Sequence, residues 1–180
     1  MKRIVLTFGL ISGVLLSAMM LSFMPFIDQI GMDHGMVIGY TTMVLAFLLV
    51  FFGIRSYRES VGNGRISFGR ALAVGFLIMG IASICYVVTW EIVYFNFLHD
   101  FGDKYAAYVI EKARAAGASA DEIARQTEEM QKFKTMYDNP LYNAAFTFLE
   151  PLPVGVPMTL ISAGILRKKR ATDQTDKDSD

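Results

Sequence analysis

Cysteine is almost absent from this 180-residue sequence, in which Cys85 is the only one. A single cysteine excludes a disulfide within the chain and a zinc site built from cysteine ligands. We interpret Cys85, which lies in an apolar run, as a small buried packing residue. An excess of either charge is absent too, because 17 lysines and arginines balance 17 aspartates and glutamates. A neutral total by itself neither favours nor excludes nucleic acid, which we do not expect as a partner.

Motifs of the common enzyme classes are also lacking. The sequence has no phosphate-binding loop of the Walker or Rossmann kind, no nucleophile elbow and no H-E-x-x-H zinc motif. His34 and His99 each lie beside an aspartate, but their spacing matches no metal motif, and we interpret both as solvated. We therefore predict no catalytic residue, no metal site and no cofactor, in a protein that is not an enzyme.

Charged residues are missing from most of four long apolar blocks, which span residues 4–27, 36–54, 71–98 and 141–166. Each block is about long enough to cross a bilayer as an α-helix. The third block is apolar on every side, so it cannot be a surface helix of a soluble protein, which needs a polar face. Hydrophobic residues make up 53% of the chain, and its mean hydropathy is +0.39. The sequence therefore predicts an all-α integral membrane protein, a four-helix transmembrane bundle in a lipid bilayer.

Residues 100–139, between the third and fourth blocks, are polar and have the periodicity of amphipathic helices. Phe101 and Tyr105 fall on one helical face. Ser119 and Glu122 have the spacing of a capping box, which marks the start of a helix. The pattern predicts two short helices that form an extramembrane hairpin. The apolar stripe along this hairpin is a candidate surface for a partner.

Basic residues flank the apolar blocks on one side of the predicted bundle, at residues 2–3, 55–70 and 167–170. The connection 28–35 contains none. Short flanks rich in lysine and arginine stay in the cytoplasm. We therefore predict a multi-pass protein of the bacterial inner membrane, with both termini in the cytoplasm and the hairpin 100–139 in the periplasm.

A single membrane domain, residues 1–170, accounts for all four blocks. The polar segment 171–180 is predicted to be a disordered cytoplasmic tail. A basic start followed by an apolar run also describes a signal peptide. The first block is long for a signal peptide and lacks a clean A-x-A cleavage site, so we favour an uncleaved first helix.

Several stretches of the sequence resemble a family of small bacterial four-pass membrane proteins. The segments GIRSYRE at 53–59 and GRISFGRA at 64–71 are similar to its G-x-x-x-Y-R and G-x-I-x-F-x-x-A patterns. The segments EPLPVG at 150–155 and ISAGILR at 161–167 also resemble it. It is the domain-of-unknown-function family numbered four-one-nine-nine. The resemblance implies an inner-membrane location and a four-pass topology, but no reaction and no catalytic residues.

Two acidic residues, Glu91 and Glu150, interrupt the apolar blocks. At about 1.5 Å per residue, Glu91 lies roughly 30 Å and Glu150 roughly 24 Å from the cytoplasmic edge. Ionisable groups at membrane depth are candidate functional residues, and two such acids can share a proton or hold a cation. The simpler interpretation is that both reach the outer headgroups, beside an aromatic belt of Tyr86, Trp90 and Tyr94.

Prolines and arginines near the membrane also have two interpretations each. Pro151, Pro153 and Pro157 should kink or break the fourth helix. Broken helices line transporter sites, although a simple kink needs no such role. Arg55 and Arg58 are candidate contacts for lipid phosphates, or they act only as topology anchors.

Glycines at helical spacing are candidates for close helix packing, namely Gly9, Gly13, Gly35, Gly39 and Gly75. Some of them should pack within the bundle. The pattern in the first helix, Gly9 and Gly13, can instead form a homodimer.

Three functions are consistent with these features. The first hypothesis is a non-enzymatic interaction or assembly protein, which contacts another membrane protein or a second copy through its helices or its hairpin. The alternative is a small transporter, or an ion or proton pathway, that uses Glu91 and Glu150. A lipid-modifying membrane enzyme is third, because only the basic inner face and the acidic outer face suggest it.

Overall fold

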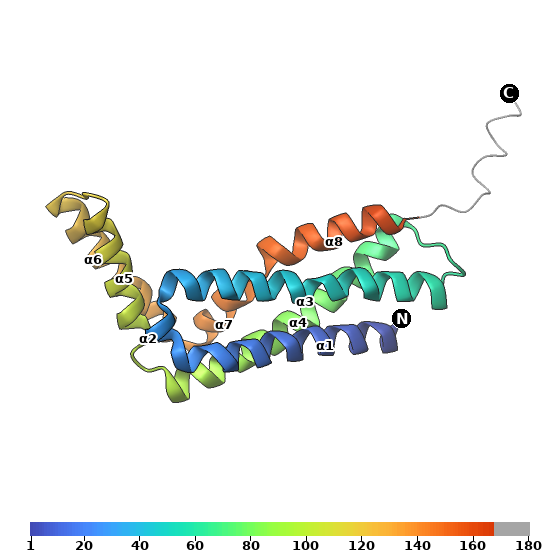
Figure 1. Ribbon diagram of the computed structural model, residues 1–180, viewed down its shortest axis with the longest axis horizontal. Helices are drawn as coiled ribbons and strands as arrows, with labels where there is room; N and C mark the ends of the chain where they lie inside the picture. Colours follow the sequence, from blue (N-terminus) through green and yellow to red (C-terminus); the bar gives the residue numbers. More distant parts are fainter. Residues whose placement is uncertain (168–180) are drawn as a thin grey trace, which may run out of the picture.

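The computed structural model describes residues 1–167, and the predicted tail, 171–180, lies outside the described residues. A bundle is formed by α1 (Lys2–Phe23), α3 (Met32–Ser60), α4 (Phe68–Phe97) and a fourth segment made of α7 (Pro140–Leu149) and α8 (Leu152–Leu166) (Figure 1). The turn η1 (Met24–Phe26) and the short α2 (Ile27–Ile30) join α1 to α3. The helices α5 (Phe101–Ala115) and α6 (Ala120–Tyr137) form a hairpin. This architecture confirms the predicted all-α class.

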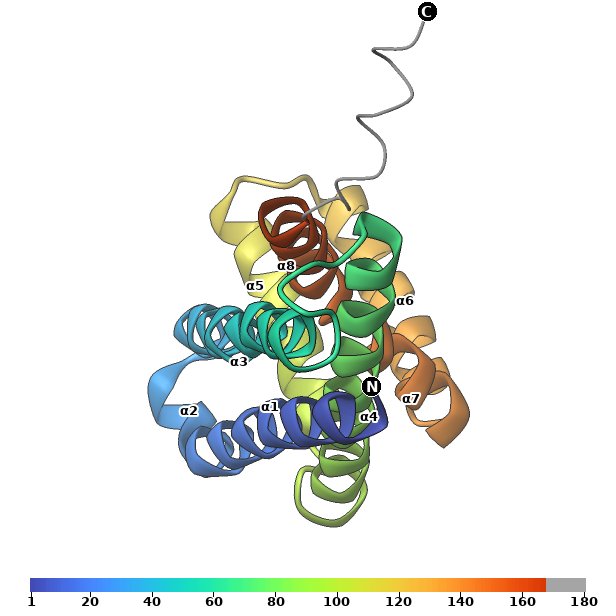
Figure 2. The same cartoon turned by 90° about the vertical axis from the view of Figure 1, so that its right-hand side faces the viewer.

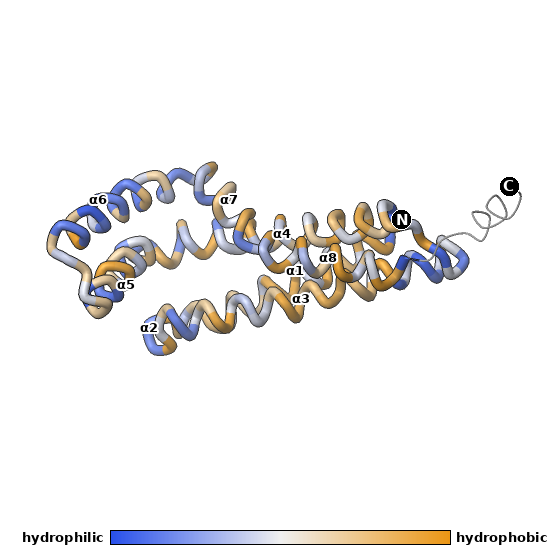
Figure 3. The backbone as a smooth tube through the Cα atoms, turned by 90° about the horizontal axis from the view of Figure 1, so that it is seen from above, coloured by the Kyte–Doolittle hydropathy of each residue, from blue (hydrophilic) through white to orange (hydrophobic). Residues whose placement is uncertain are grey.

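Four helical segments are long and apolar enough to cross a membrane. Figure 3 shows the apolar middle of the bundle between two polar ends. One end, which we call the basic end, contains the N-terminus and the connection between α3 and α4. The opposite end, which we call the hairpin end, contains α5 and α6. Length and composition together define a multi-pass membrane protein.

Helix α4 is the centre of the bundle, because it contacts α1, α3, α7 and α8; Figure 2 shows these helices from the basic end. The core between α3 and α4 contains the fully buried side chains of Phe47, Ile54, Val74 and Ile78. Many large apolar side chains are exposed on the outer surface instead, including Leu10, Val14, Leu77 and Ile84. An apolar exterior of this kind is matched to lipid rather than to water.

Small residues bring α1 close to α4. A Cβ atom added at Gly13 would lie 2.6 Å from the Cβ of Cys85. Beside this contact, the hydroxyl groups of Ser17 and Thr89 form a hydrogen bond of 2.7 Å. Both observations place the first-helix glycine pattern inside the chain's own bundle, so a second copy would have to use another face.

The other glycines named from the sequence differ in their surroundings. Gly9, Gly35 and Gly75 lie against Ile81, Ile27 and Thr159 of neighbouring elements. A Cβ at Gly39, by contrast, would meet no atom within 4 Å. Gly39 therefore borders open space.

The fourth membrane segment is broken where the prolines begin. Helix α7 ends at Leu149 and α8 starts at Leu152, with Glu150 and Pro151 between them. Pro151 and Pro153 lack the backbone N–H groups that would continue the helical hydrogen bonds. The break places Glu150 at the corner between α7 and α8.

Candidate functional site

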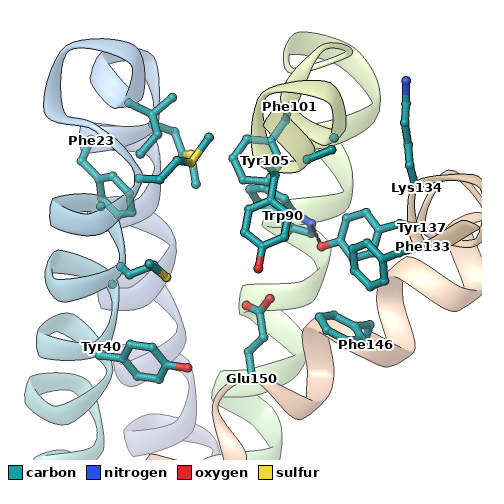
Figure 4. A pocket seen from close by; sticks show the side chains of 18 of the residues that line it. Phe23, Tyr40, Trp90, Phe101, Tyr105, Phe133, Lys134, Tyr137, Phe146 and Glu150 are labelled. Atoms are coloured by element: carbon teal, nitrogen blue, oxygen red, sulfur yellow. Dashed lines mark hydrogen bonds between the residues drawn. The ribbon is translucent and has the colours of Figure 1, made fainter. Parts of the chain in front are cut away.

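A cavity of about 380 Å³ lies where the hairpin meets the bundle. Figure 4 shows α1 and α3 on one side of it and α4 to α7 on the other. Most of its lining is aromatic or thioether, including Phe23, Met36, Met43, Phe101, Phe133 and Phe146. A cavity of this size and apolarity is in the range that holds a small molecule.

Glu150 is the only acidic side chain among the lining residues. Its carboxylate points into the cavity from the corner between α7 and α8. The hydroxyl of Tyr86, on α4, donates a hydrogen bond of 3.0 Å to Oε2 of Glu150. Tyr40 of α3 lines the opposite wall. The lining of this part of the cavity therefore combines the carboxylate of Glu150 with the phenol groups of Tyr86 and Tyr40.

Trp90, the only tryptophan of the chain, forms the wall above Glu150. Its indole N–H donates a hydrogen bond of 2.9 Å to the hydroxyl of Tyr137. Its ring meets the edge of Phe101 with the centroids 5.1 Å apart. Only 5% of Trp90 is exposed, so these contacts hold α4, α5 and α6 at one point.

A buried chain of hydrogen bonds continues from this wall into α7. The hydroxyl of Tyr137 bonds that of Thr147 at 3.3 Å. Thr147 donates to the amide oxygen of Asn143 at 3.2 Å, and the amide nitrogen of Asn143 donates to the backbone carbonyl of Tyr137. Burial raises the pKa of Tyr137 to about 12, so the hydroxyl stays protonated at neutral pH. Asn143 and Thr147 are fully buried, which makes this network the fixed side of the cavity.

Ion pairs attach the hairpin to α2 and to the first turn of α3. Lys104 contacts Asp28 at 2.7 Å, and Lys112 contacts Asp33 at 2.8 Å. The hydroxyl of Tyr108 also donates to Asp33. The hydrogen bond to Asp28 raises the pKa of Lys104 above its ordinary value, so this lysine is charged at neutral pH. These pairs are exposed, and exposed ion pairs are individually weak.

The structure does not bring Glu91 and Glu150 together. Glu91 is absent from the cavity lining, and its Oε1 is buried without a hydrogen-bond partner in the part of the chain that the structure describes. Glu150 lies beside Tyr86, which precedes Glu91 by five residues, a rise of about 7.5 Å along α4. Of these two acids, only Glu150 therefore lines this cavity.

Tyr86, Trp90 and Tyr94 do not form the outward-facing aromatic belt that was expected around these acids. Trp90 and Tyr94 are 5% and 3% exposed, and Tyr86 faces the cavity. These side chains point into the protein because α5, α6 and α7 cover this side of α4, which the sequence pattern does not show. The interpretation as an outward belt was wrong.

The remaining candidates lie away from the cavity. Arg55 pairs with Glu59 at 3.0 Å, and Arg58 reaches the same carboxylate, both at the basic end. Contact of these arginines with lipid phosphates remains a prediction. Within residues 1–167, no group of three or more histidine, cysteine, aspartate or glutamate side chains is arranged to hold a metal ion.

Fold and site together describe a multi-pass membrane protein with a partly open cavity near one end. A sequence model of the family described as "Protein of unknown function (DUF4199)" matches residues 7–168. The chain belongs to this family, which confirms the resemblance seen in the sequence. No curated protein and no solved structure matches the chain.

Proposed function

We propose that this protein binds a small amphipathic molecule in the cavity at its hairpin end, as the binding step of a small carrier. The observation that carries the proposal is the Glu150 carboxylate, held by Tyr86 at 3.0 Å on the floor of a cavity of about 380 Å³. A site with an apolar lining and a few convergent polar groups is the usual form of a small-molecule site. The proposal follows the transporter hypothesis from the sequence, but it uses Glu150 alone in place of the pair Glu91 and Glu150.

The same geometry weakens the reason for proposing an interaction or assembly role. The apolar stripe of the hairpin was the feature that suggested a partner. Phe101, Tyr105 and Phe133 of this stripe line the cavity, so the chain's own bundle uses that face. The interaction role remains a prediction without a surface assigned to it, and no described contact favours a lipid-modifying enzyme.

We also propose a location and an orientation for the protein. The basic residues of the α3–α4 connection and of the N-terminus support a cytoplasmic basic end. The hairpin end then faces the periplasm of a bacterial inner membrane. In this orientation the cavity lies near the outer surface of the membrane, where an amphipathic molecule concentrates.

Energy transfer from Trp90 to N-phenyl-1-naphthylamine, a neutral apolar fluorophore, tests the binding function. Trp90 lines the cavity and is the only tryptophan, so a bound probe quenches its emission. We expect saturable quenching in nanodiscs of uncharged lipid. Gly39→Leu should reduce the affinity at least about tenfold, since the new side chain occupies the open space beside Gly39.

Gly164→Leu is the matched control, because Gly164 is exposed on α8 and also borders open space. This variant should bind the probe as the wild type does. Quenching that is not saturable, or that is unchanged in Gly39→Leu, would contradict the proposed function.

A further inference from the structure

We infer that the cavity selects an organic cation, an ammonium or phosphonium group that carries an apolar or aromatic body. This inference rests on the proposed binding function and adds the chemical class of the ligand. Three observations support it: the charges of the lining residues, the aromatic side chains and the methionine side chains.

The charge balance of the cavity is negative at its floor. Lys134 is the only other charged lining residue; it lies at the rim (Figure 4) and pairs with Asp103. Within residues 1–167, no lysine, arginine or histidine forms an ion pair with Glu150, whose one hydrogen-bond partner is Tyr86. A carboxylate removed from water without a counter-charge is costly. A ligand cation beside Glu150 supplies that counter-charge.

Aromatic rings line several sides of the cavity that contains Glu150. Tyr86 and Trp90 lie on α4, Tyr40 lies across from them on α3, and Phe101 and Tyr105 close the side toward the hairpin. The face of an aromatic ring attracts a cation, most strongly when both are shielded from water. Rings and carboxylate therefore favour the same charge.

Thioethers line the remaining space, through Met24, Met36 and Met43. Methionine side chains are unbranched and polarizable, so they adapt to apolar bodies of different shape. A ligand cation stabilises the charged form of Glu150, which neither an anionic nor a neutral ligand does. The lining thus selects by charge more strongly than by shape.

A pair of nearly isosteric compounds tests this selection. 4-Phenylbutyltrimethylammonium and its neutral analogue, with carbon in place of nitrogen, compete against N-phenyl-1-naphthylamine in the Trp90 assay. In the wild type the cation should displace the probe at a concentration at least about tenfold lower than the neutral compound. Uncharged lipid in the nanodiscs prevents a preference that comes from the membrane surface.

Three variants assign this preference to the carboxylate. Glu150→Gln keeps the shape and an acceptor for Tyr86 but removes the charge. Whatever affinity for the probe it retains, the two compounds should compete against that probe about equally. Glu150→Asp keeps the charge and should retain a preference. Glu91→Gln, outside the cavity, should behave as the wild type.

The possible results distinguish the binding function from the selectivity for a cation. Equal competition by the two compounds in the wild type, or an undiminished preference in Glu150→Gln, would overturn the cation inference while leaving the binding function intact. A wild type that shows no saturable quenching would overturn the binding function and this inference with it. If Glu150→Gln does not fold, the comparison in the wild type and in Glu150→Asp still decides.

Discussion

A leucine in place of Gly13 is expected to prevent α1 from docking on α4. The first atom of the new side chain would already lie 2.6 Å from Cβ and 2.7 Å from Sγ of Cys85, with the backbone of Ala82 at 3.5 Å behind them. Overpacking of this kind costs about 1–3 kcal/mol. Moving the helices apart would also break the hydrogen bond between Ser17 and Thr89, which adds about 1 kcal/mol.

Thermal unfolding in detergent, followed by circular dichroism, measures this effect. Gly13→Leu should unfold at a clearly lower temperature than the wild type. The control is again Gly164→Leu, which has the same added volume on an exposed face of α8 and should unfold near the wild-type temperature. Equal stability of the two variants would show that α1 does not pack on α4 through its glycine face.

Asn143→Ala is expected to loosen the wall of the cavity. It removes the acceptor of the Thr147 hydroxyl and the donor to the Tyr137 carbonyl, in a place where both Asn143 and Thr147 are fully buried. A buried polar group left without a partner costs about 1–3 kcal/mol. The Tyr137 carbonyl loses its side-chain donor, while Thr147 keeps the hydroxyl of Tyr137 as a partner. We therefore expect a loss of about 1–3 kcal/mol of stability.

The emission of Trp90 reports the same change locally. Trp90 is joined to this network through the hydroxyl of Tyr137, so its emission should shift to longer wavelength as water reaches the ring. Asn96→Ala is the matched control, because Asn96 is exposed and bonds only the carbonyl of Ile92 in its own helix. A variant at Asn143 with wild-type emission and stability would refute the role given to the network.

The features that could be predicted from the sequence are those that local patterns determine. The apolar blocks correspond to helices because length and hydropathy alone decide whether a helix can span a bilayer. Ser119 was predicted to cap a helix, and its hydroxyl does accept a hydrogen bond from the backbone N–H of Glu122. The break between α7 and α8 follows from the missing N–H groups of Pro151 and Pro153.

The candidate site depended on contacts between helices, which a single sequence does not encode in any local pattern. Glu150 was recognisable as a charge in an apolar block, but its partner Tyr86 lies 64 positions away. Depth counting placed Glu91 and Glu150 at similar heights and could not show which faces of α4 and α7 meet. For the same reason Asn143 and Thr147 gave no signal, since a polar residue in a membrane helix is informative only when its neighbour is known.

For the hairpin, the sequence predicted the helices correctly but not what their apolar face contacts. Its amphipathic pattern predicted two helices, and α5 and α6 are present. The same pattern suggested a free apolar face, because amphipathicity identifies a face to be buried without telling what buries it. Here Phe101 and Phe133 line the cavity, so the chain's own fold takes up this part of the stripe.

Photo-crosslinking tests the central claim, that a small molecule occupies this cavity, most directly. A diazirine derivative of 4-phenylbutyltrimethylammonium is irradiated with the wild type in nanodiscs, and the labelled peptides are mapped by mass spectrometry. We expect adducts on the cavity faces of α3 and α5, within 32–43 and 101–106. Excess N-phenyl-1-naphthylamine and the Gly39→Leu substitution should each remove them. Adducts spread over lipid-facing positions such as Leu10 and Leu77, unchanged by the competitor, would contradict the claim.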